Sequence, residues 1–188
     1  RSSRIGMSRK SGWSDGEATS TLTYDPDSRL QAETVNHGSF GLSYSYTYYA
    51  NGLKKSLTYP GGTTYTYRYG LHNELAAVEI PAEGSITVND FRWRAAARIT
   101  LPGGTTQRYG YDGLLMRTEQ EVTSPSGTSL LSVLNQYGKR RQLTSKTING
   151  ARTDYRYDSE LRLLEADKDG AQPEIYALDA VGNRLTDS

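Results

Sequence analysis

Aromatic and small polar residues alternate strictly along parts of this chain. Tyr44, Tyr46 and Tyr48 are separated by Ser45 and Thr47, and residues 64–69 repeat the pattern. A period of two places every Tyr of such a stretch on one face of a β-strand and the small polar residues on the other. Tyr and Thr also favour strands. These stretches are therefore predicted to be strands with one aromatic face.

Each alternating stretch leads into a short motif typical of a tight turn. Residues 24–30 and 157–163 both read Tyr-Asp, three residues, then Arg-Leu. The last copy, residues 178–185, keeps the Asp and has Gly three residues after it; residues 48–53 have Gly in the same place. Asp suits the first position of a type I turn, and Gly suits the fourth, where φ is often positive. Each unit is predicted to be a β-hairpin.

The motif recurs along the chain. We call the residue directly before each predicted turn the lead residue, and successive lead residues are 18 to 24 residues apart, a spacing typical of small repeats. Eight lead residues, all aromatic or Leu, are predicted: Tyr24, Tyr48, Tyr69, Trp93, Tyr111, Leu134, Tyr157 and Leu178. The turn positions singled out with them are Asp25, Gly52, Asp112, Gly138, Asp158, Asp179 and Gly182. Residues 111–115 look like the motif with two turn residues deleted.

A second turn sequence is written twice. Residues 58–64 and 100–106 share Pro-Gly-Gly-Thr-Thr, 42 residues apart. The paired glycines are not followed by Lys-Ser/Thr or by a helix start, so they do not indicate a phosphate-binding loop. Pro followed by Gly is a turn signal. These segments are predicted to connect one hairpin to the next.

The remaining segments bear on the domain organisation. Residues 1–20 are polar, lack the motif and are predicted to be an irregular lead-in to a repeat region at 21–188. Residues 94–98 are rich in Ala and Arg but fall in a repeat turn, so they are predicted to be non-helical. Residues 121–131 are predicted to form a longer hairpin loop. The absence of an initiating Met suggests a piece excised from a longer polypeptide.

Composition fits an all-β chain of about eight consecutive antiparallel hairpins in a thin, curved, single-layer sheet. There are 15 Tyr against 2 Phe and 2 Trp, and only 35% of the residues are hydrophobic, too few for a thick core. The formal net charge of +1, from 22 basic and 21 acidic residues, gives no reason to expect a nucleic acid or membrane partner. No stretch has transmembrane length, and the lack of Cys excludes disulfides and thiolate sites.

The sequence offers no catalytic, metal-binding or cofactor-binding constellation. His37 and His72 lie in different repeats without supporting ligands, so loop positions are favoured over a metal pair. The motif acids can be interpreted as a calcium ladder, but their fixed place in the motif favours turn caps. The Tyr stripes are expected to pack across strands, with sugar stacking as the alternative. We expect a chain that is not an enzyme.

With these motifs assembled, the chain resembles the YD-repeat, or RHS-repeat, family, on residues 24–30, 157–163 and 178–185 and on the Pro-Gly-Gly-Thr segments. The resemblance covers about residues 21–188. It implies hairpins joined into a strip that spirals into a hollow shell around a C-terminal toxin, as in bacterial polymorphic toxins and insecticidal toxin complexes. Related repeats occur in teneurins, where the role is cell-surface adhesion.

The chain also departs from that family pattern. Eight repeats are too few to close a container, and the C-terminal core segment with Asp-Pro-x-Gly and self-cleaving aspartates is not found. The sequence hypothesis is therefore a structural segment of a shell, secreted or at the cell surface and made in the bacterial cytoplasm, whose partners are adjacent repeats and an enclosed cargo. The alternative is a module for adhesion, or for binding a glycan or a protein, through the Tyr-rich face. The excised segment is expected to self-associate through unpaired strand edges.

Overall fold

The computed structural model describes residues 2–5, 9–179 and 181–187, which are almost entirely strands and tight turns. Residues 1 and 6–8 of the predicted lead-in, and Ala180 in the last copy of the motif, lie outside the described residues. The strands are β1 (Ser2–Ile5), β2 (Arg9–Ser14), β3 (Thr19–Tyr24), β4 (Leu30–Asn36), β5 (Gly41–Tyr48), β6 (Lys54–Thr58), β7 (Thr64–Tyr69), β8 (Leu75–Ile80), β9 (Gly84–Arg92), β10 (Ala95–Thr100), β11 (Thr106–Tyr111), β12 (Arg117–Thr123), β13 (Ser129–Tyr137), β14 (Leu143–Ile148), β15 (Ala151–Tyr157), β16 (Leu163–Lys168), β17 (Glu174–Leu178) and β18 (Arg184–Asp187). A single 3-10 turn, Pro102–Gly104, is the only helical element among the described residues.

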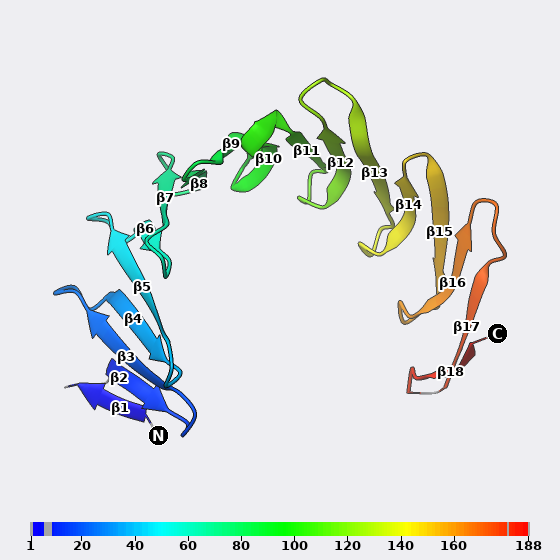
Figure 1. Cartoon of the computed structure of the whole chain (residues 1–188). Helices are drawn as coiled ribbons and strands as arrows, with labels where there is room; N and C mark the ends of the chain where they lie inside the picture. Colours follow the sequence, from blue (N-terminus) through cyan, green and yellow to red (C-terminus); the bar gives the residue numbers. More distant parts are fainter. Residues whose placement is uncertain (1, 6–8, 180, 188) are drawn as a thin grey trace. The chain divides into compact units, whose positions relative to one another are not determined.

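Each strand pairs with the next one in the sequence, and the registers are antiparallel (Figure 1). The chain divides into two compact units, residues 1–88 and 89–188, with the boundary inside β9. Within each unit the described hairpins follow one another as a single layer, and no described residue forms a second sheet or an α-helix against either face. The prediction of an all-β chain of consecutive antiparallel hairpins is confirmed. The number of repeats stays a prediction.

Burial is slight, as a single layer requires. Among the described residues the buried hydrophobic side chains are Ala18, 6% exposed, and Val133, 8% exposed. Along β5 the exposure alternates, with each Tyr half-buried and each Ser or Thr between them exposed. The register places Ser45 opposite Thr58, and Thr58 opposite Thr64, so the small hydroxyl residues share one face. The sheet therefore has an aromatic face and a hydroxyl face in this unit.

Ten turns in the described residues share one geometry. The amide of the first turn residue donates to the carbonyl of the fifth, and the amide of the fourth donates to the carbonyl of the first. The first residues are Asp25, Tyr49, Tyr59, Gly70, Leu101, Asp112, Ser124, Gly138, Asp158 and Asp179. The fourth residue has φ between 60° and 92° in all ten. This is the three-residue hairpin loop in which a type I or II turn is followed by a left-handed residue.

A β-bulge accompanies eight of these turns. The register shifts at the residue directly before the turn, so that Tyr24 pairs with Leu30 while Thr23 pairs with Ala32. Equivalent shifts occur at Tyr48, Tyr69, Tyr111, Thr123, Tyr137, Tyr157 and Leu178. The two turns without a shift are the two Pro-Gly-Gly turns. Because a bulge bends and twists its strand, the two kinds of turn are structurally distinct.

The structure corrects the predicted register of one repeat. Leu134 lies inside β13, opposite Thr147, and the bulge and turn follow Tyr137 instead. Gly138 is therefore the first turn residue, not the fourth. Its lack of a side chain is used there, because a Cβ would lie 2.3 Å from Nε2 of Gln142.

Two other expectations about turns were wrong. Asp112 opens a turn of full length, with its amide bonded to the carbonyl of Met116 at 3.0 Å, so no residues are deleted. Trp93 does not precede a five-residue turn: it lies in the short β9–β10 turn itself, with φ 58°, and is 85% exposed. Leu115 takes the left-handed position that Gly fills in five of the ten turns.

Three segments differ from their predicted local structure. Residues 95–100 are non-helical as predicted, but they form strand β10 and not a turn. The predicted long loop at residues 121–131 is a five-residue turn between two extended strands, with Gly127 at φ 86°. Strands β1 and β2 lie within the expected lead-in, where Gly12 faces the backbone of Ser20 so closely that a Cβ would lie 2.0 Å from its carbonyl oxygen.

Candidate functional site

The chemistry-bearing residues of the chain gather at seven of the eight turns that follow a bulge; the eighth, opened by Ser124, lies at the opposite end of β12 from the Asp112 turn. We call this line of turns the motif edge; it comprises the turns beginning at Asp25, Tyr49 and Gly70 in the first unit, and at Asp112, Gly138, Asp158 and Asp179 in the second. Antiparallel hairpins bring alternate turns to the same side of a sheet, so within each unit these turns are neighbours. Apart from Trp93, in the β9–β10 turn, and Leu134, inside β13, the predicted repeat positions fall at or next to these turns.

The motif aspartates cap their own turns. Oδ1 of Asp158 accepts hydrogen bonds from the amides of Glu160 and Arg162, both at 2.9 Å. Asp112 and Asp179 receive the equivalent amides, and Asp25 receives the amide of the fifth turn residue. These bonds satisfy backbone donors that the hairpin ladder leaves free. The interpretation of the acids as turn caps thus agrees with the contacts.

Two turns of the motif edge are capped by a different residue. In the turn opened by Gly70, the carboxylate of Glu74 accepts the amide of His72 at 2.9 Å. In the turn opened by Gly138, Gln142 accepts the amide of Arg140 at 3.1 Å. The cap has moved from the first to the fifth turn residue, whose side chain occupies the space above the glycine. These caps were not predicted from the sequence, although Gly followed four residues later by Glu or Gln is a readable signal.

The arginine of the motif binds the capping aspartate. Nε of Arg162 lies 2.6 Å from Oδ2 of Asp158, and Nη1 lies 3.3 Å from Glu160. Arg29 forms the same pair with Asp25, also at 2.6 Å. One carboxylate therefore accepts hydrogen bonds from backbone amides on one oxygen and from a guanidinium on the other. This explains why Asp and Arg recur together four residues apart.

These contacts shift the titration of the caps. The backbone amide of Arg162, followed by its guanidinium, lowers the pKa of Asp158 below 3.8. The side-chain amide and backbone amide of Asn183 lower the pKa of Asp179. At Asp25 partial desolvation opposes the shift, but the bonds from Arg29 outweigh it and the pKa is lowered as well. The caps are held as carboxylates, as charge-assisted hydrogen bonds require.

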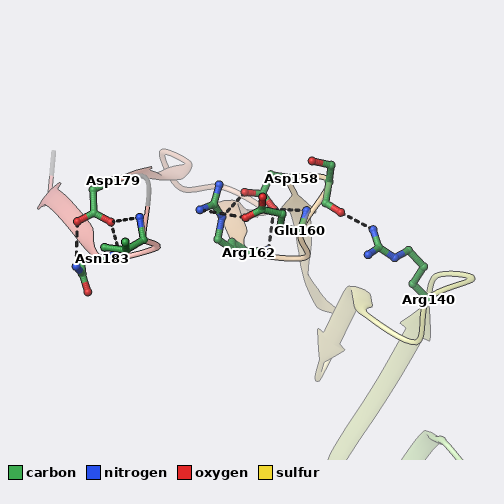
Figure 2. Close-up of polar contacts among 8 residues, drawn as sticks. Arg140, Asp158, Glu160, Arg162, Asp179 and Asn183 are labelled. Atoms are coloured by element: carbon green, nitrogen blue, oxygen red, sulfur yellow. Dashed lines mark hydrogen bonds and ion pairs between the residues drawn. The ribbon is translucent and has the colours of Figure 1, made fainter.

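Further contacts join one turn of the motif edge to the next. Nη1 of Arg140 donates to the carbonyl oxygen of Ser159 at 2.7 Å. Figure 2 shows Arg140 reaching toward the turn that holds Asp158 and Arg162. In the first unit Nη1 of Arg29 donates to the carbonyl oxygen of Tyr49 at 3.2 Å. The guanidinium carbon of Arg29 also lies 5.0 Å from the ring centre of Tyr48. Successive hairpins are thus linked side chain to backbone at their turns.

The lead tyrosines add a second set of links. The Tyr48 hydroxyl donates to the carbonyl oxygen of Leu30 at 2.8 Å, on the neighbouring strand. The same type of bond runs from Tyr24 to Lys10, from Tyr111 to Ala96 and from Tyr137 to Arg117. Each acceptor carbonyl belongs to the first or second residue of the strand that precedes the strand of its tyrosine. The recurrent Tyr of the motif is therefore a cross-strand hydrogen-bond donor as well as a packing residue.

Burial on the aromatic face changes the tyrosines that carry it. Desolvation raises the pKa of Tyr46, Tyr48, Tyr67, Tyr69 and Tyr157 above 10. Edge-to-face contacts, such as that between Tyr49 and Tyr69 at 6.1 Å, and the ammonium group of Lys54, 5.1 Å from the Tyr46 ring, complete the face. The face is held neutral and packed, which is the arrangement of a structural surface.

The histidines and acids do not converge. The His37 ring stacks on Phe40 with centres 5.0 Å apart, in a turn on the opposite side from that of His72. In the described residues no three His, Asp or Glu side chains gather in a way that could hold a metal ion. No helix of the described residues is long and apolar enough to cross a membrane.

Comparisons with known proteins agree with this architecture. The crystal structure titled TcdB2-TccC3-Cdc42 matches with a TM-score of 0.85 and 12% identity, over 98% of this chain and 12% of the other. TcdB2-TccC3 without its hypervariable C-terminal region gives 0.82 and 13%, over 94% and 11%. The Photorhabdus luminescens Tc holotoxin pore with the TccC3 mutation D651A gives 0.77 and 11%, also over 94% and 11%. At these identities the likeness is one of fold.

The chain spans about one eighth of the length of these structures, so it corresponds to a small part of each. Among curated protein sequences no match was found. The family profile described as the teneurin YD-shell matches residues 6–187, which is nearly the whole chain and includes every repeat described above. The chain therefore belongs to the teneurin YD-shell family.

Proposed function

We propose that this chain is a wall segment of a hollow shell that encloses a cargo domain of a larger, exported, toxin-associated polypeptide. Its membership of the YD-shell family and its fold likeness to the TcdB2-TccC3 structures support a shell segment. The enclosed cargo and the export are the proposed parts. The partners are the adjacent repeats and that cargo.

The observation that carries the proposal is the near absence of a core. A globular domain buries its apolar side chains between layers, whereas only two hydrophobic side chains are buried in the described part of this chain. Its hairpins instead bind their neighbours through the turn links and tyrosine hydroxyls described above. Such a sheet gains stability when further hairpins pair with its edge strands, as in repeat proteins. It also separates the space on one face from the space on the other.

We propose a purely structural role, without catalysis. The motif aspartates, the motif arginines and the lead tyrosines form the hydrogen bonds that cap and link the turns. The capping carboxylates are themselves bound by backbone amides and a guanidinium. A general base needs access to a substrate proton, and these carboxylates are occupied by the turn itself.

The test is protection of the cargo in the natural polypeptide. We expect a domain outside the repeats to resist protease while the wall is intact and to become susceptible when the motif edge is weakened by Asp158→Ala together with Arg162→Ala. Lys139→Ala, at an exposed turn residue on the same edge, is the matched control and should leave protection unchanged.

A natural polypeptide with neither further repeats nor a cargo domain would contradict enclosure, as would a cargo equally susceptible in all three forms. Self-association of the isolated segment stays a separate prediction, because strand edges that pair with further repeats would then be open to other copies.

A further inference from the structure

Three turns of the second unit display bulky side chains to solvent. We call them the tip row: residues 93–94 between β9 and β10, residues 112–116 between β11 and β12, and residues 138–142 between β13 and β14. Trp93 is 85% exposed in the first turn, and Leu114 and Leu115 are 61% and 45% exposed in the second. Arg141 is exposed in the third. The tip row therefore presents aromatic, aliphatic and cationic side chains in succession.

The lead tyrosines hold the turns of the tip row side by side. Tyr111, directly before the second turn, donates its hydroxyl to the carbonyl oxygen of Ala96, just after the first turn, at 2.9 Å. Tyr137, directly before the third turn, donates to the carbonyl oxygen of Arg117, directly after the second, also at 2.9 Å. Figure 1 shows the turns after β11 and β13 on one side of the layer and the turn after β12 on the other. Because neighbouring tips are two strand spacings apart, they are separated by about 10 Å.

Each turn of the tip row holds a large side chain on a left-handed backbone. The φ angles are 58° at Trp93, 60° at Leu115 and 64° at Arg141. Glycine adopts this conformation without steric cost, and it does so in five of the ten five-residue turns. Leu161 has the same backbone but is half-buried. The side chains of the tip row are exposed, so burial does not offset the strain, and strain of this kind indicates that the side chain itself has a role.

The tip row is locally cationic, although the formal net charge of the chain is only +1. Residues 92–94, 112–116 and 138–142 contain five basic residues and one acidic residue. The carboxylate of that acid, Asp112, caps its own turn. No acidic side chain in the described part of the chain forms an ion pair with Arg94 or Arg141. Positive charge therefore lies beside the exposed Trp and Leu side chains without being neutralised.

This composition fits the surface of an anionic membrane. Trp is enriched at the level of the lipid headgroups, and Lys and Arg are attracted to anionic lipids. A small anion would bind the cations alone and leave the apolar tips in water. A stable protein interface covers about 800 Å² on each partner, whereas the tip row offers separate projecting turns. A lipid surface can accept such turns one by one.

We propose that the tip row binds the surface of an anionic lipid bilayer. Trp93, Leu114 and Leu115 enter the headgroup region. The guanidinium groups of Arg94 and Arg141 lie against the lipid phosphates. The chain rests on the bilayer by its turns and does not cross it. The inference goes beyond the wall function and does not rest on it, because enclosing a cargo requires no lipid.

The experiment sediments the 188-residue chain with sucrose-loaded vesicles. One set consists of phosphatidylcholine, and the other of equal parts of phosphatidylcholine and phosphatidylserine. We expect binding to the anionic vesicles only, and weaker binding as the salt concentration rises, because salt screens the attraction. The tryptophan emission should shift to shorter wavelength on binding, and Trp93→Ala should abolish that shift.

Three variants test the residues of the tip row. Trp93→Ala should weaken binding about tenfold through the loss of apolar contact. Arg94→Ala together with Arg141→Gly should weaken it about twentyfold, because each cation near an anionic surface contributes about fivefold. Leu115→Gly removes an apolar side chain and also relieves the left-handed backbone, so it should weaken binding without lowering the melting temperature. This variant separates loss of binding from loss of folding.

Two variants serve as matched controls. Leu71→Ala removes a leucine that is 98% exposed, from a turn of the first unit. Arg156→Ala removes one positive charge from β15, where Arg156 pairs with Glu165. Both should leave the affinity unchanged.

Four results would overturn the proposal: no binding to anionic vesicles, equal binding to neutral ones, full binding by the Trp93→Ala chain, or tighter binding of polyglutamate than of the vesicles. The last result would point to an acidic protein partner. The wall function is tested by cargo protection and has no lipid readout, so failure of one proposal leaves the other unaffected.

Discussion

Arg140 and Ser159 belong to successive turns of the motif edge, and Nη1 of Arg140 donates to the carbonyl oxygen of Ser159 at 2.7 Å. The bond joins two hairpins that otherwise meet through their strands. Because a repeat array is stabilised by interfaces between neighbours, links of this kind add to the strength of the wall. They lie at the exposed rim, where a variant can remove them without disturbing the sheet.

Arg140→Ala is expected to loosen the neighbouring turn without unfolding the chain. Amide hydrogen exchange at residues 158–162 should become faster, and the loss in stability should stay below about 1 kcal/mol, as for other exposed charged contacts. Lys139→Ala removes the same charge one residue away and should leave the exchange unchanged. Equal exchange in the two variants would refute the link.

Leu115→Gly is expected to stabilise the chain. Leu115 has φ 60° and is 45% exposed, so glycine relieves a left-handed conformation at little loss of packing. The gain should be about 1 kcal/mol, measured by thermal or urea unfolding. Leu114→Gly, in the same turn and 61% exposed but without the left-handed backbone, should not stabilise. A lower melting temperature for the Leu115 variant would show that its side chain has a packing role.

Asp158→Asn is expected to destabilise the chain near neutral pH and to lose that effect in acid. The folded pKa of Asp158 is lowered, so its contribution is fully present above the unfolded value of about 3.8 and is lost as the pH falls through the folded pKa. The difference in melting temperature between wild type and variant should therefore shrink below pH 4. Glu160→Gln, whose carboxylate lies 3.3 Å from Arg162 and is 69% exposed, should have the smaller effect. A difference that does not vary with pH would exclude the charge as the cause.

Ionisation of the tyrosines on the aromatic face is expected to destabilise the fold at alkaline pH. The pKa of Tyr46, Tyr67 and three further tyrosines is raised by burial, so their contribution is complete below pH 10 and is lost as the pH rises through the folded pKa values. Absorbance at 295 nm should show part of the phenols titrating above 10 in the folded chain, and all of them near 10 in denaturant. Identical curves would mean that the face is open to water.

Tyr48→Phe tests the hydroxyl link separately from the ring. Loss of the 2.8 Å bond to Leu30 should cost about 1 kcal/mol. Tyr44→Phe is the matched control on the same strand, because no partner of the Tyr44 hydroxyl is found in the described part of the chain. Equal stability of the two variants would assign the recurrent Tyr to packing alone.

The sequence alone was sufficient to predict the hairpins, the aromatic face and most of the motif edge. Alternation in residues 44–48 decides the face, because successive side chains of a strand point in opposite directions. Asp158 and Gly182 mark their turns because a carboxylate caps free amides and glycine tolerates positive φ. These are local requirements, written within a few residues of where they act.

The tertiary structure decided what depends on partners distant in the sequence. The true lead residue Tyr137 and the links from Arg140 and Tyr48 require the register of neighbouring strands, which local propensity leaves open. Local turn chemistry thus determined that this chain folds as repeated hairpins, whereas the pairing between strands decided how those hairpins are joined, because contacts across a sheet depend on register.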